Sequence, residues 1–305
     1  MQTIFTASAK LPAITAAIGF FDGVHVGHRA LISAIISEAR RTGNVSAVVT
    51  FRRHPRAVLN SDYRPQLINT FEEKIALLAE TGLDYAIVLD FDEKMSKMTG
   101  KEFIAYLRDN YNMRGLYVGY DHRFGHNRSD GFEDYVRYGK ELGVEVLRSE
   151  AVIMGNIPVS SSAIRRFLLE GDLANAEQML SYKYFLTGKV VAGYGIGRKL
   201  GFRTANIDVE DLDKLIPANG VYAVYVTTPD CVMCKGMLNI GNRPTVHNNN
   251  ERVIEANIFD YEADLYGAVI TVTFAVYMRE ELKMESMEAL RLQIVEDKRN
   301  ALELL

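Results

Sequence analysis

The chain has 305 residues, of which 48% are hydrophobic and 24% charged, and its formal net charge is −4. The length suits two domains better than one, and the balance is ordinary for a globular protein in water. The absence of long basic runs speaks against a nucleic-acid surface, and the absence of a long apolar run speaks against a membrane span.

The first part of the chain alternates short apolar runs with amphipathic helical patterns. Strands are predicted at 13–19, 45–51, 85–90, 115–119 and 144–147, and helices at 29–41, 71–81, 100–110, 132–142, 162–170 and 173–180. Strands that alternate with helices indicate βαβ units. The first part is therefore predicted to be an α/β domain with a parallel, Rossmann-like sheet.

The pattern changes after about residue 184, where short β-rich runs separated by turn signals replace the helices. Strands are predicted at 185–191, 221–227, 235–240, 253–259 and 269–277. This spacing is typical of an antiparallel barrel. A last amphipathic helix is predicted at 285–304, with Met287, Leu290, Ile294 and Leu302 facing inward. We place the domain boundary between residues 182 and 183, which gives domains 1–182 and 183–305.

The two cysteines of the chain, Cys231 and Cys234, are spaced as Cys-x-x-Cys. Such a pair can be a redox couple or half of a zinc site, but the sequence has no second pair to complete a tetrahedral site. The segment 228–236 is predicted first as a turn between strands. The small number of cysteines, and a first segment without the basic-then-apolar pattern of a signal peptide, predict a cytoplasmic protein.

A segment rich in glycine and histidine, 19–28, follows the first predicted strand and leads into the first predicted helix. Its glycines allow a ligand to approach the backbone, and the helix N-terminus offers N–H groups and positive potential to an anion. His25 and His28 lie three residues apart, so both can donate to phosphate from one face of the helix. The alternative, a turn with two surface histidines, leaves the full combination of residues unexplained. The segment predicts a nucleotide-phosphate site.

The pattern Gly-x-Phe-Asp-Gly-x-His-x-Gly-His resembles the signature of bacterial bifunctional riboflavin kinase/FMN adenylyltransferases, also called FAD synthetases. The resemblance implies that His25 and His28 are catalytic. It also implies that ATP is bound by Gly19, Phe20, Asp22, Gly23 and Gly27.

Three further segments of the first domain resemble the same family. Residues 50–51 and 54–55 look like its strand-two element, and residues 119–125 look like its flavin-side loop, which implies a flavin contact at Asp121. Residues 159–165 look like its second ATP motif. The resemblance implies that Arg165 is catalytic and that phosphate is bound by Ser160, Ser161 and Ser162. From the residues alone, serines that cap a helix leave amides available and Arg165 can fork onto phosphate, with plain helix capping as the alternative.

A glycine-rich loop with two adjacent cations spans 193–201, and such a loop either cradles phosphate or forms a flexible barrel corner. The continuation 202–206 resembles the riboflavin kinase motif, which implies Mg²⁺ ligands at Thr204 and Asn206. Segments 220–222, 239–241, 243–245 and 264–267 also match in order, with a flavin contact implied at Arg279. The loop residues expected at ATP phosphate are Gly193, Gly195, Gly197, Lys199 and Gly201.

Glu255 is predicted on a strand, on the face opposite Ile254 and Ala256. The resemblance implies that Glu255 is the general base that takes the proton from the riboflavin 5′-hydroxyl. A solvated glutamate on a barrel strand is the alternative from the residues alone.

The chain departs from the family pattern mainly in the barrel. The family usually has proline at the position of Arg203, histidine or tyrosine at that of Asn257, and phenylalanine at that of Met284. In the first domain, His122 replaces a usual phenylalanine. The usual Leu-Gly-Arg-Pro-Tyr element reads Leu-Ser-Tyr-Lys-Tyr at 180–184. These departures leave one alternative open, an FAD synthetase with a weakened or decayed kinase that serves as a flavin-binding regulator.

The resemblance as a whole implies two reactions: riboflavin and ATP give FMN, and FMN and ATP give FAD and pyrophosphate. Mg²⁺ is the expected cofactor, and riboflavin, FMN and ATP are the expected partners, with the oligomeric state left open. A cytidylyltransferase, or another adenylyltransferase with an unrelated barrel, is the rival enzyme. The Thr204-Ala205-Asn206 motif after the glycine-rich loop speaks against it.

Overall fold

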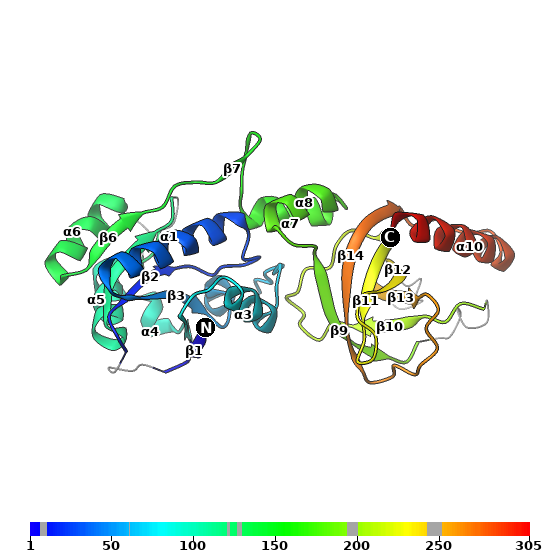
Figure 1. Cartoon of the computed structure of the whole chain (residues 1–305), viewed down its shortest axis with the longest axis horizontal. Helices are drawn as coiled ribbons and strands as arrows, with labels where there is room; N and C mark the ends of the chain where they lie inside the picture. The colour runs from blue at the N-terminus through cyan, green and yellow to red at the C-terminus, as the bar shows by residue number, and fades with distance from the viewer. Residues whose placement is uncertain (7–10, 61, 121–122, 127–129, 194–200, 243–251) are drawn as a thin grey trace. The chain divides into compact units, whose positions relative to one another are not determined.

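The structure is a computed structural model that describes residues 1–6, 11–60, 62–120, 123–126, 130–193, 201–242 and 252–305 (Figure 1). The chain divides into two compact units, Met1–Ser161 and Ser162–Leu305. Each unit has its own sheet, and the two are described separately below.

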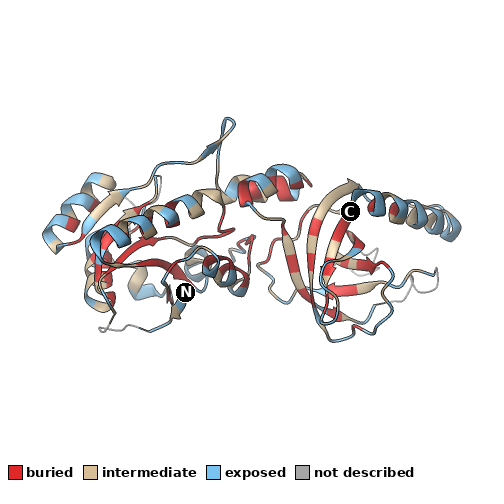
Figure 2. Cartoon of the chain, in the orientation of Figure 1, coloured by how far each residue is buried: buried red, intermediate tan, exposed pale blue. Residues whose placement is uncertain are grey.

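The first unit contains a six-stranded sheet in the order β1-β4-β3-β2-β5-β6, and every pairing in it is parallel. The strands are β1 (Gln2–Ile4), β2 (Ile14–Ile18), β3 (Val45–Phe51), β4 (Tyr85–Leu89), β5 (Met113–Val118) and β6 (Glu145–Arg148). All five residues of β2 are buried, as expected for a central strand covered on both faces (Figure 2). The prediction of a parallel α/β sheet is confirmed.

Helices connect these strands. They are α1 (Val26–Thr42), α2 (Pro55–Leu59), α3 (Phe71–Ala79), α4 (Glu93–Ser96), α5 (Gly100–Tyr111) and α6 (Phe132–Leu142), and a small hairpin of β7 (Ile153–Met154) and β8 (Ile157–Pro158) follows β6. Capping boxes begin α3 at Thr70 and α5 at Thr99. Because β3 lies on one side of β2 and β5 on the other, the strand order reverses at β2, and ligands of such sheets bind at the carboxyl ends of the strands there.

The second unit contains a closed barrel in the order β10-β13-β12-β11-β14-β9, and all its pairings are antiparallel. Two helices precede it, α7 (Ser161–Leu169) and α8 (Leu173–Leu180). The strands are β9 (Phe185–Val191), β10 (Ala205–Asp208), β11 (Gly220–Thr227), β12 (Cys234–Asn242), β13 (Arg252–Ile258) and β14 (Val269–Arg279). The predicted barrel is confirmed, with β10 as an additional strand inside the riboflavin-kinase-like motif.

The last helix, α10 (Met287–Leu304), contacts β11 and β12, and Ile294 and Ala301 pack against a small apolar cluster there. Met287 and Leu302 are 53% and 41% exposed, so the prediction that they face inward is wrong. The reason is that the inward row includes the buried carboxylate of Asp297, a residue that hydrophobic periodicity does not select. Within the described residues, no helix combines the length and the apolar character that crossing a membrane requires.

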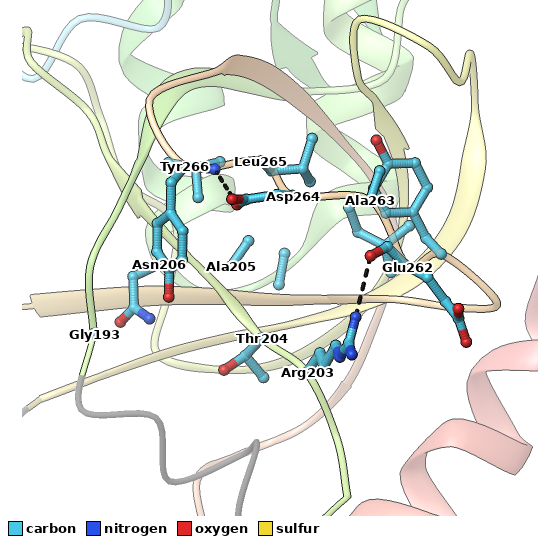
Figure 3. Close-up of a pocket in the computed structure, with 14 residues that line it drawn as sticks. Gly193, Arg203, Thr204, Ala205, Asn206, Glu262, Ala263, Asp264, Leu265 and Tyr266 are labelled. Carbon is cyan, nitrogen blue, oxygen red and sulfur yellow. Dashed lines mark hydrogen bonds between the residues drawn. The ribbon is translucent and has the colours of Figure 1, made fainter.

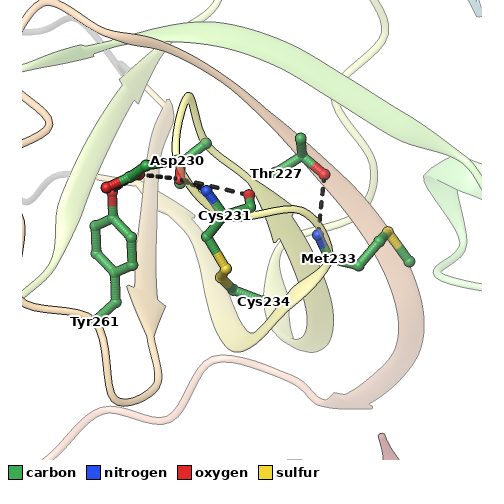
Figure 4. Close-up of a disulfide and its surroundings, with 7 residues drawn as sticks. Thr227, Asp230, Cys231, Met233, Cys234 and Tyr261 are labelled. Carbon is green, nitrogen blue, oxygen red and sulfur yellow. Dashed lines mark hydrogen bonds between the residues drawn. A yellow bond between two sulfur atoms is a disulfide. The ribbon is translucent and has the colours of Figure 1, made fainter.

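The predicted turn between β11 and β12 is confirmed, since β11 ends at Thr227 and β12 begins at Cys234. Cys231 and Cys234 form a disulfide across this turn (Figure 4). The turn is also held by side chains: Thr228 Oγ1 accepts the N–H of Cys231 at 3.0 Å, and the Tyr261 hydroxyl donates to the Asp230 carboxylate. Sulfurs bonded to each other cannot ligate zinc, so this arrangement does not fit the zinc alternative.

Candidate active sites

The loop between β2 and α1 has a constrained backbone. Gly23 has φ +86°, and the non-glycine residues Phe21 and Val24 have φ +57° and +37°. Such conformations cost free energy and persist only where the surroundings enforce them, often at functional sites. The carboxylate of Asp22 provides one such restraint, because it is 4% exposed and accepts the backbone N–H groups of Ile68 (2.9 Å) and Asn69. Its described contacts therefore fix the loop.

The two motif histidines lie together at the start of α1. Their rings stack with centroids 3.6 Å apart, and the ring of Phe21 packs edge-on against His28 at 5.1 Å. His25 is the N-cap residue, and its Nδ1 accepts the backbone N–H of His28 at 3.2 Å. Because Nδ1 accepts, the proton of neutral His25 lies on Nε2, which can act as a donor. The first turn of α1 carries no acidic residue, so its positive potential is retained.

The second ATP motif begins at the end of the first unit. The Ser161 hydroxyl donates to the backbone carbonyl of Asp22 at 2.9 Å. This bond ties the segment to the loop between β2 and α1, which we call the histidine loop. Ser162 and Arg165 lie in α7, within the second compact unit. The predicted phosphate contacts of Ser160, Ser162 and Arg165 stay predictions.

A cavity of about 210 Å³ opens in the first unit beside the histidine loop. Its walls are mainly apolar, and they include Phe20 from the loop, Phe51 at the end of β3, and Phe124 from the flavin-side loop. Pro55, which the sequence analysis selected in the strand-two element, also lines the cavity. The remaining apolar wall comes from residues that the sequence analysis did not select: Ile18, Leu59, Phe91, Met95, Met98 and Phe103. A flat aromatic ligand suits such a lining.

The flavin-side loop is anchored at this cavity. Phe124 stacks on the buried ring of Tyr135 with centroids 4.2 Å apart, and the Tyr135 hydroxyl donates to the Phe124 carbonyl and accepts its N–H, both at 2.9 Å. Gly125 has φ +93°, and a Cβ there would collide with the backbone of Gly100. Asp121 and His122, the other residues selected in this loop, lie outside the described residues.

A second cavity of about 320 Å³ opens in the barrel, lined by the segment 203–206 and the segment 261–266 (Figure 3). The predicted metal residues Thr204 and Asn206 both line it. Asn206 is 8% exposed, and its Oδ1 is a buried acceptor without a hydrogen-bond partner among the described residues. A Cβ at Gly193 would collide with the Asn206 side chain, so a larger residue there would displace the Asn206 amide.

Two departures from the family pattern contact each other beside this cavity. Asn257 Nδ2 donates to the backbone carbonyl of Arg203 at 2.6 Å. Arg203 Nη1 donates to the carbonyl of Glu262 at 3.1 Å (Figure 3). Arg203 thus ties the chain before β10 to the segment 261–266 on the other side of the cavity. Asn257 is 8% exposed, so its bond is well shielded from water.

The register of the barrel brings Glu255 next to the predicted metal residue Asn206. Glu255 of β13 pairs directly with Asn206 of β10 and with Asn239 of β12. Residues directly opposite each other in an antiparallel ladder share a face of the sheet, with Cβ atoms about 5 Å apart. Its neighbours Ile254 and Ala256 are buried on the other face, as the sequence predicts.

Arg279 makes contacts that the sequence analysis did not foresee. Its guanidinium forms a bidentate ion pair with the buried carboxylate of Asp297, at 2.9 and 2.6 Å, and a further bond to the carbonyl of Glu280. These contacts tie β14 to α10. A flavin contact of Arg279 stays a prediction, and Gly195, Gly197 and Lys199 of the glycine-rich loop lie outside the described residues.

Comparisons with known proteins match nearly the whole chain. The family model described as FAD synthetase matches residues 8–163, and the model described as riboflavin kinase matches residues 180–305. A bifunctional riboflavin kinase/FMN adenylyltransferase of Escherichia coli strain K12 is 34% identical over 287 residues, which cover 94% of this chain and 91% of the relative. The protein of that name from Bacillus subtilis strain 168 is 32% identical and covers 94% and 90%.

A solved structure supports the same architecture. The crystal structure of a Streptococcus pneumoniae protein named as a macrolide-efflux protein has a TM-score of 0.88, is 29% identical, and covers 99% of each chain. The two family models together with the full-length relatives confirm the resemblance inferred from the motifs. The chain belongs to the family of bifunctional riboflavin kinase/FMN adenylyltransferases.

Proposed function

We propose that the chain carries out both reactions of its family, each at one of the two cavities. The barrel phosphorylates riboflavin with ATP to give FMN and ADP, and the first unit joins FMN and ATP to give FAD and pyrophosphate. Both activities stand in the names of the relatives, and nothing there supports the alternative of a decayed kinase. One observation supports placing FAD formation at the 210 Å³ cavity, which we call the aromatic cavity. Phe20 belongs to the loop between β2 and α1, where the phosphates are expected, and it also forms a wall of this cavity.

In the first unit, a phosphate oxygen of FMN attacks the α-phosphorus of ATP, and the bond to the β-phosphate breaks. The FMN phosphate is already a nucleophile, so the reaction needs no covalent enzyme intermediate. The Nε2–H of His25, the ring of His28 and the N-terminus of α1 stabilise the negative charge on the phosphates, with Arg165 as a further cation. Catalysis here consists of positioning and charge stabilisation.

In the barrel, Glu255 accepts the proton of the riboflavin 5′-hydroxyl as its oxygen attacks the γ-phosphorus of ATP, and ADP leaves. The residues in the cavity fit a magnesium ion. Mg²⁺ takes oxygen ligands and keeps water and substrate phosphates as others, so Thr204 and Asn206 suffice as protein ligands. The buried Asn206 Oδ1 is the observation that supports this. A bound Mg²⁺ would neutralise charge on the ATP phosphates.

Asn206→Ala removes that oxygen and should raise the Mg²⁺ concentration needed for half-maximal riboflavin phosphorylation by about tenfold, the usual effect of losing one ligand-shell contact. The measurement is the initial rate of FMN formation against Mg²⁺ concentration. The Mg²⁺ dependence of FAD formation from added FMN serves as the control, since that reaction belongs to the other unit. An unchanged Mg²⁺ midpoint for phosphorylation would remove Asn206 from the metal site.

Met95→Trp tests whether the 210 Å³ cavity holds the flavin ring. Met95 lines the cavity, and the larger indole occupies space that the ring would need. The KM for FMN in FAD formation should rise by at least about tenfold, a typical cost for steric loss in an apolar site. Riboflavin phosphorylation by the same preparation should keep its wild-type rate. A KM for FMN within twofold of wild type would place the flavin elsewhere.

The first domain is proposed to extend to residue 182, so that α7 and its second ATP motif belong to the adenylyltransferase. The FAD synthetase model ends at residue 163 and the riboflavin kinase model begins at residue 180, which leaves room for this assignment. We place the protein in the cytoplasm, where ATP for both reactions is present. In that reducing compartment the Cys231–Cys234 disulfide is open to reduction.

A further inference from the structure

Lys74 of α3 is a buried cation to which the reactions above give no role. Its side chain is 2% exposed, which is rare for lysine. The Nζ donates to three acceptors: the carbonyl of Phe20 at 3.2 Å, the hydroxyl of Thr50 at 3.3 Å and the carbonyl of Phe51 at 3.0 Å. An ammonium has three protons, so this arrangement uses all its donors.

The surroundings keep this cation in place. Burial lowers the pKa of Lys74 to about 8, and the nearby Asp22 carboxylate opposes that shift, so the side chain is mostly protonated at neutral pH. The Nζ also lies 4.0 Å from the centroid of the Phe20 ring, within the range of a cation–π contact. Thr50 donates its own proton to the Phe20 carbonyl at 3.1 Å and completes a closed group of bonds.

The acceptors of Lys74 coincide with the walls of the aromatic cavity. Phe20 and Phe51 both line it. Phe20 follows β2 by two residues and Phe51 ends the adjacent strand β3. A single ammonium therefore holds the backbone carbonyls of two aromatic residues that line the cavity. Charged donors form stronger hydrogen bonds than neutral ones, and their loss leaves buried carbonyls unpaired.

We propose that Lys74 is a positioning residue for FMN adenylylation, which holds Phe20 and Phe51 as the walls of the slot for the flavin ring. The proposal rests on the assignment of this cavity to FMN. Phe20 belongs both to the slot and to the histidine loop, where the ATP phosphates are expected, whereas Phe51 belongs to the slot alone. Loss of Lys74 therefore impairs FMN binding more than ATP binding.

Lys74→Met keeps the length and apolar stem of the side chain and removes its charge and donors. The KM for FMN should rise by about tenfold, as expected for losing a buried charged donor, while the KM for ATP changes less and kcat falls by less than the KM rises. Lys74→Arg keeps the charge in a different shape and should restore part of the affinity for FMN. Thr50→Val removes the shared hydroxyl and should give a smaller rise.

Three controls separate this role from a structural one. Lys140→Met removes an exposed lysine of the same unit and should leave every constant unchanged. Riboflavin phosphorylation by the same Lys74→Met preparation should match wild type, and the melting temperature reports any loss of stability. A lowered melting temperature with an unchanged KM for FMN means that Lys74 only stabilises the fold, which overturns the proposal.

The Met95→Trp variant separates the assignment of the cavity to FMN from the proposed role of Lys74. If Met95→Trp raises the KM for FMN and Lys74→Met does not, the cavity binds the flavin and the proposal for Lys74 alone is wrong. If neither variant changes that KM, the cavity assignment fails and the proposal fails with it. Equal increases in the KM for FMN and for ATP would mean that Lys74 acts on the histidine loop as a whole. That result would also overturn the proposal.

Discussion

Replacing His28 by alanine should lower the rate of FAD formation from FMN and ATP by about a hundredfold or more, the usual effect of losing a preorganised donor to a charged transition state. The ring of His28 stacks on His25 at 3.6 Å, within the first turn of α1. Its removal takes away a donor and also a wall that orients the His25 ring. The measurement is the initial rate of FAD formation, with the product resolved by chromatography.

The barrel provides an internal control for this variant. Riboflavin phosphorylation should stay near wild type, because that reaction belongs to the other compact unit. His28→Asn keeps a shorter N–H donor and should retain more activity than alanine. Equal loss of both activities, in a protein with unchanged circular dichroism, would contradict separate sites.

The fold could be predicted where a periodic pattern is long enough. The buried runs of β2 and β3 and the alternating strands of the barrel are visible in the sequence, and both architectures follow from them. The strands β1 and β10 were missed because they span only Gln2–Ile4 and Ala205–Asp208, too few residues to show a period. Their pairing with distant strands defines them, and no local pattern carries that information.

The candidate sites could also be predicted only in part from the sequence. The stacked pair of His25 and His28 follows from their spacing on one helical turn, which the sequence shows. The bonds of Lys74 to Phe20 and Phe51 join residues 54 and 23 positions apart, and the Asn257–Arg203 bond joins residues 54 apart. Such contacts depend on the tertiary structure. The one local signal for Lys74 was its place three and four residues before the buried Leu77 and Leu78, on the inward face of an amphipathic helix.

A variant of the barrel should have the opposite effect to His28→Ala, with loss of riboflavin phosphorylation and no loss of FAD formation. Glu255→Gln keeps the shape of the side chain and removes its ability to accept the hydroxyl proton. Riboflavin phosphorylation should fall by about a hundredfold or more, within the range that general-base catalysis contributes. Added FMN should still be converted to FAD at the wild-type rate, because the histidine loop is untouched.

The position of Glu255 makes this variant a sharp test. It pairs with Asn206 in the barrel ladder, so removal of its charge also alters the field at the proposed metal residue. Glu262→Gln is the matched control, because Glu262 lines the barrel cavity and is exposed, and the substitution makes the same change of charge. We expect Glu262→Gln to keep most of its phosphorylation rate.

The Glu262→Gln variant separates the two ways in which Glu255 could act. If Glu255 is the general base, Glu255→Gln loses most of its phosphorylation rate and Glu262→Gln does not. If the negative charge alone mattered, Glu262→Gln would show a comparable loss. Near-wild-type phosphorylation by Glu255→Gln would make Glu255 a solvated strand residue, and the base would have to be sought among the carboxylates that line the barrel cavity, Glu262 and Asp264.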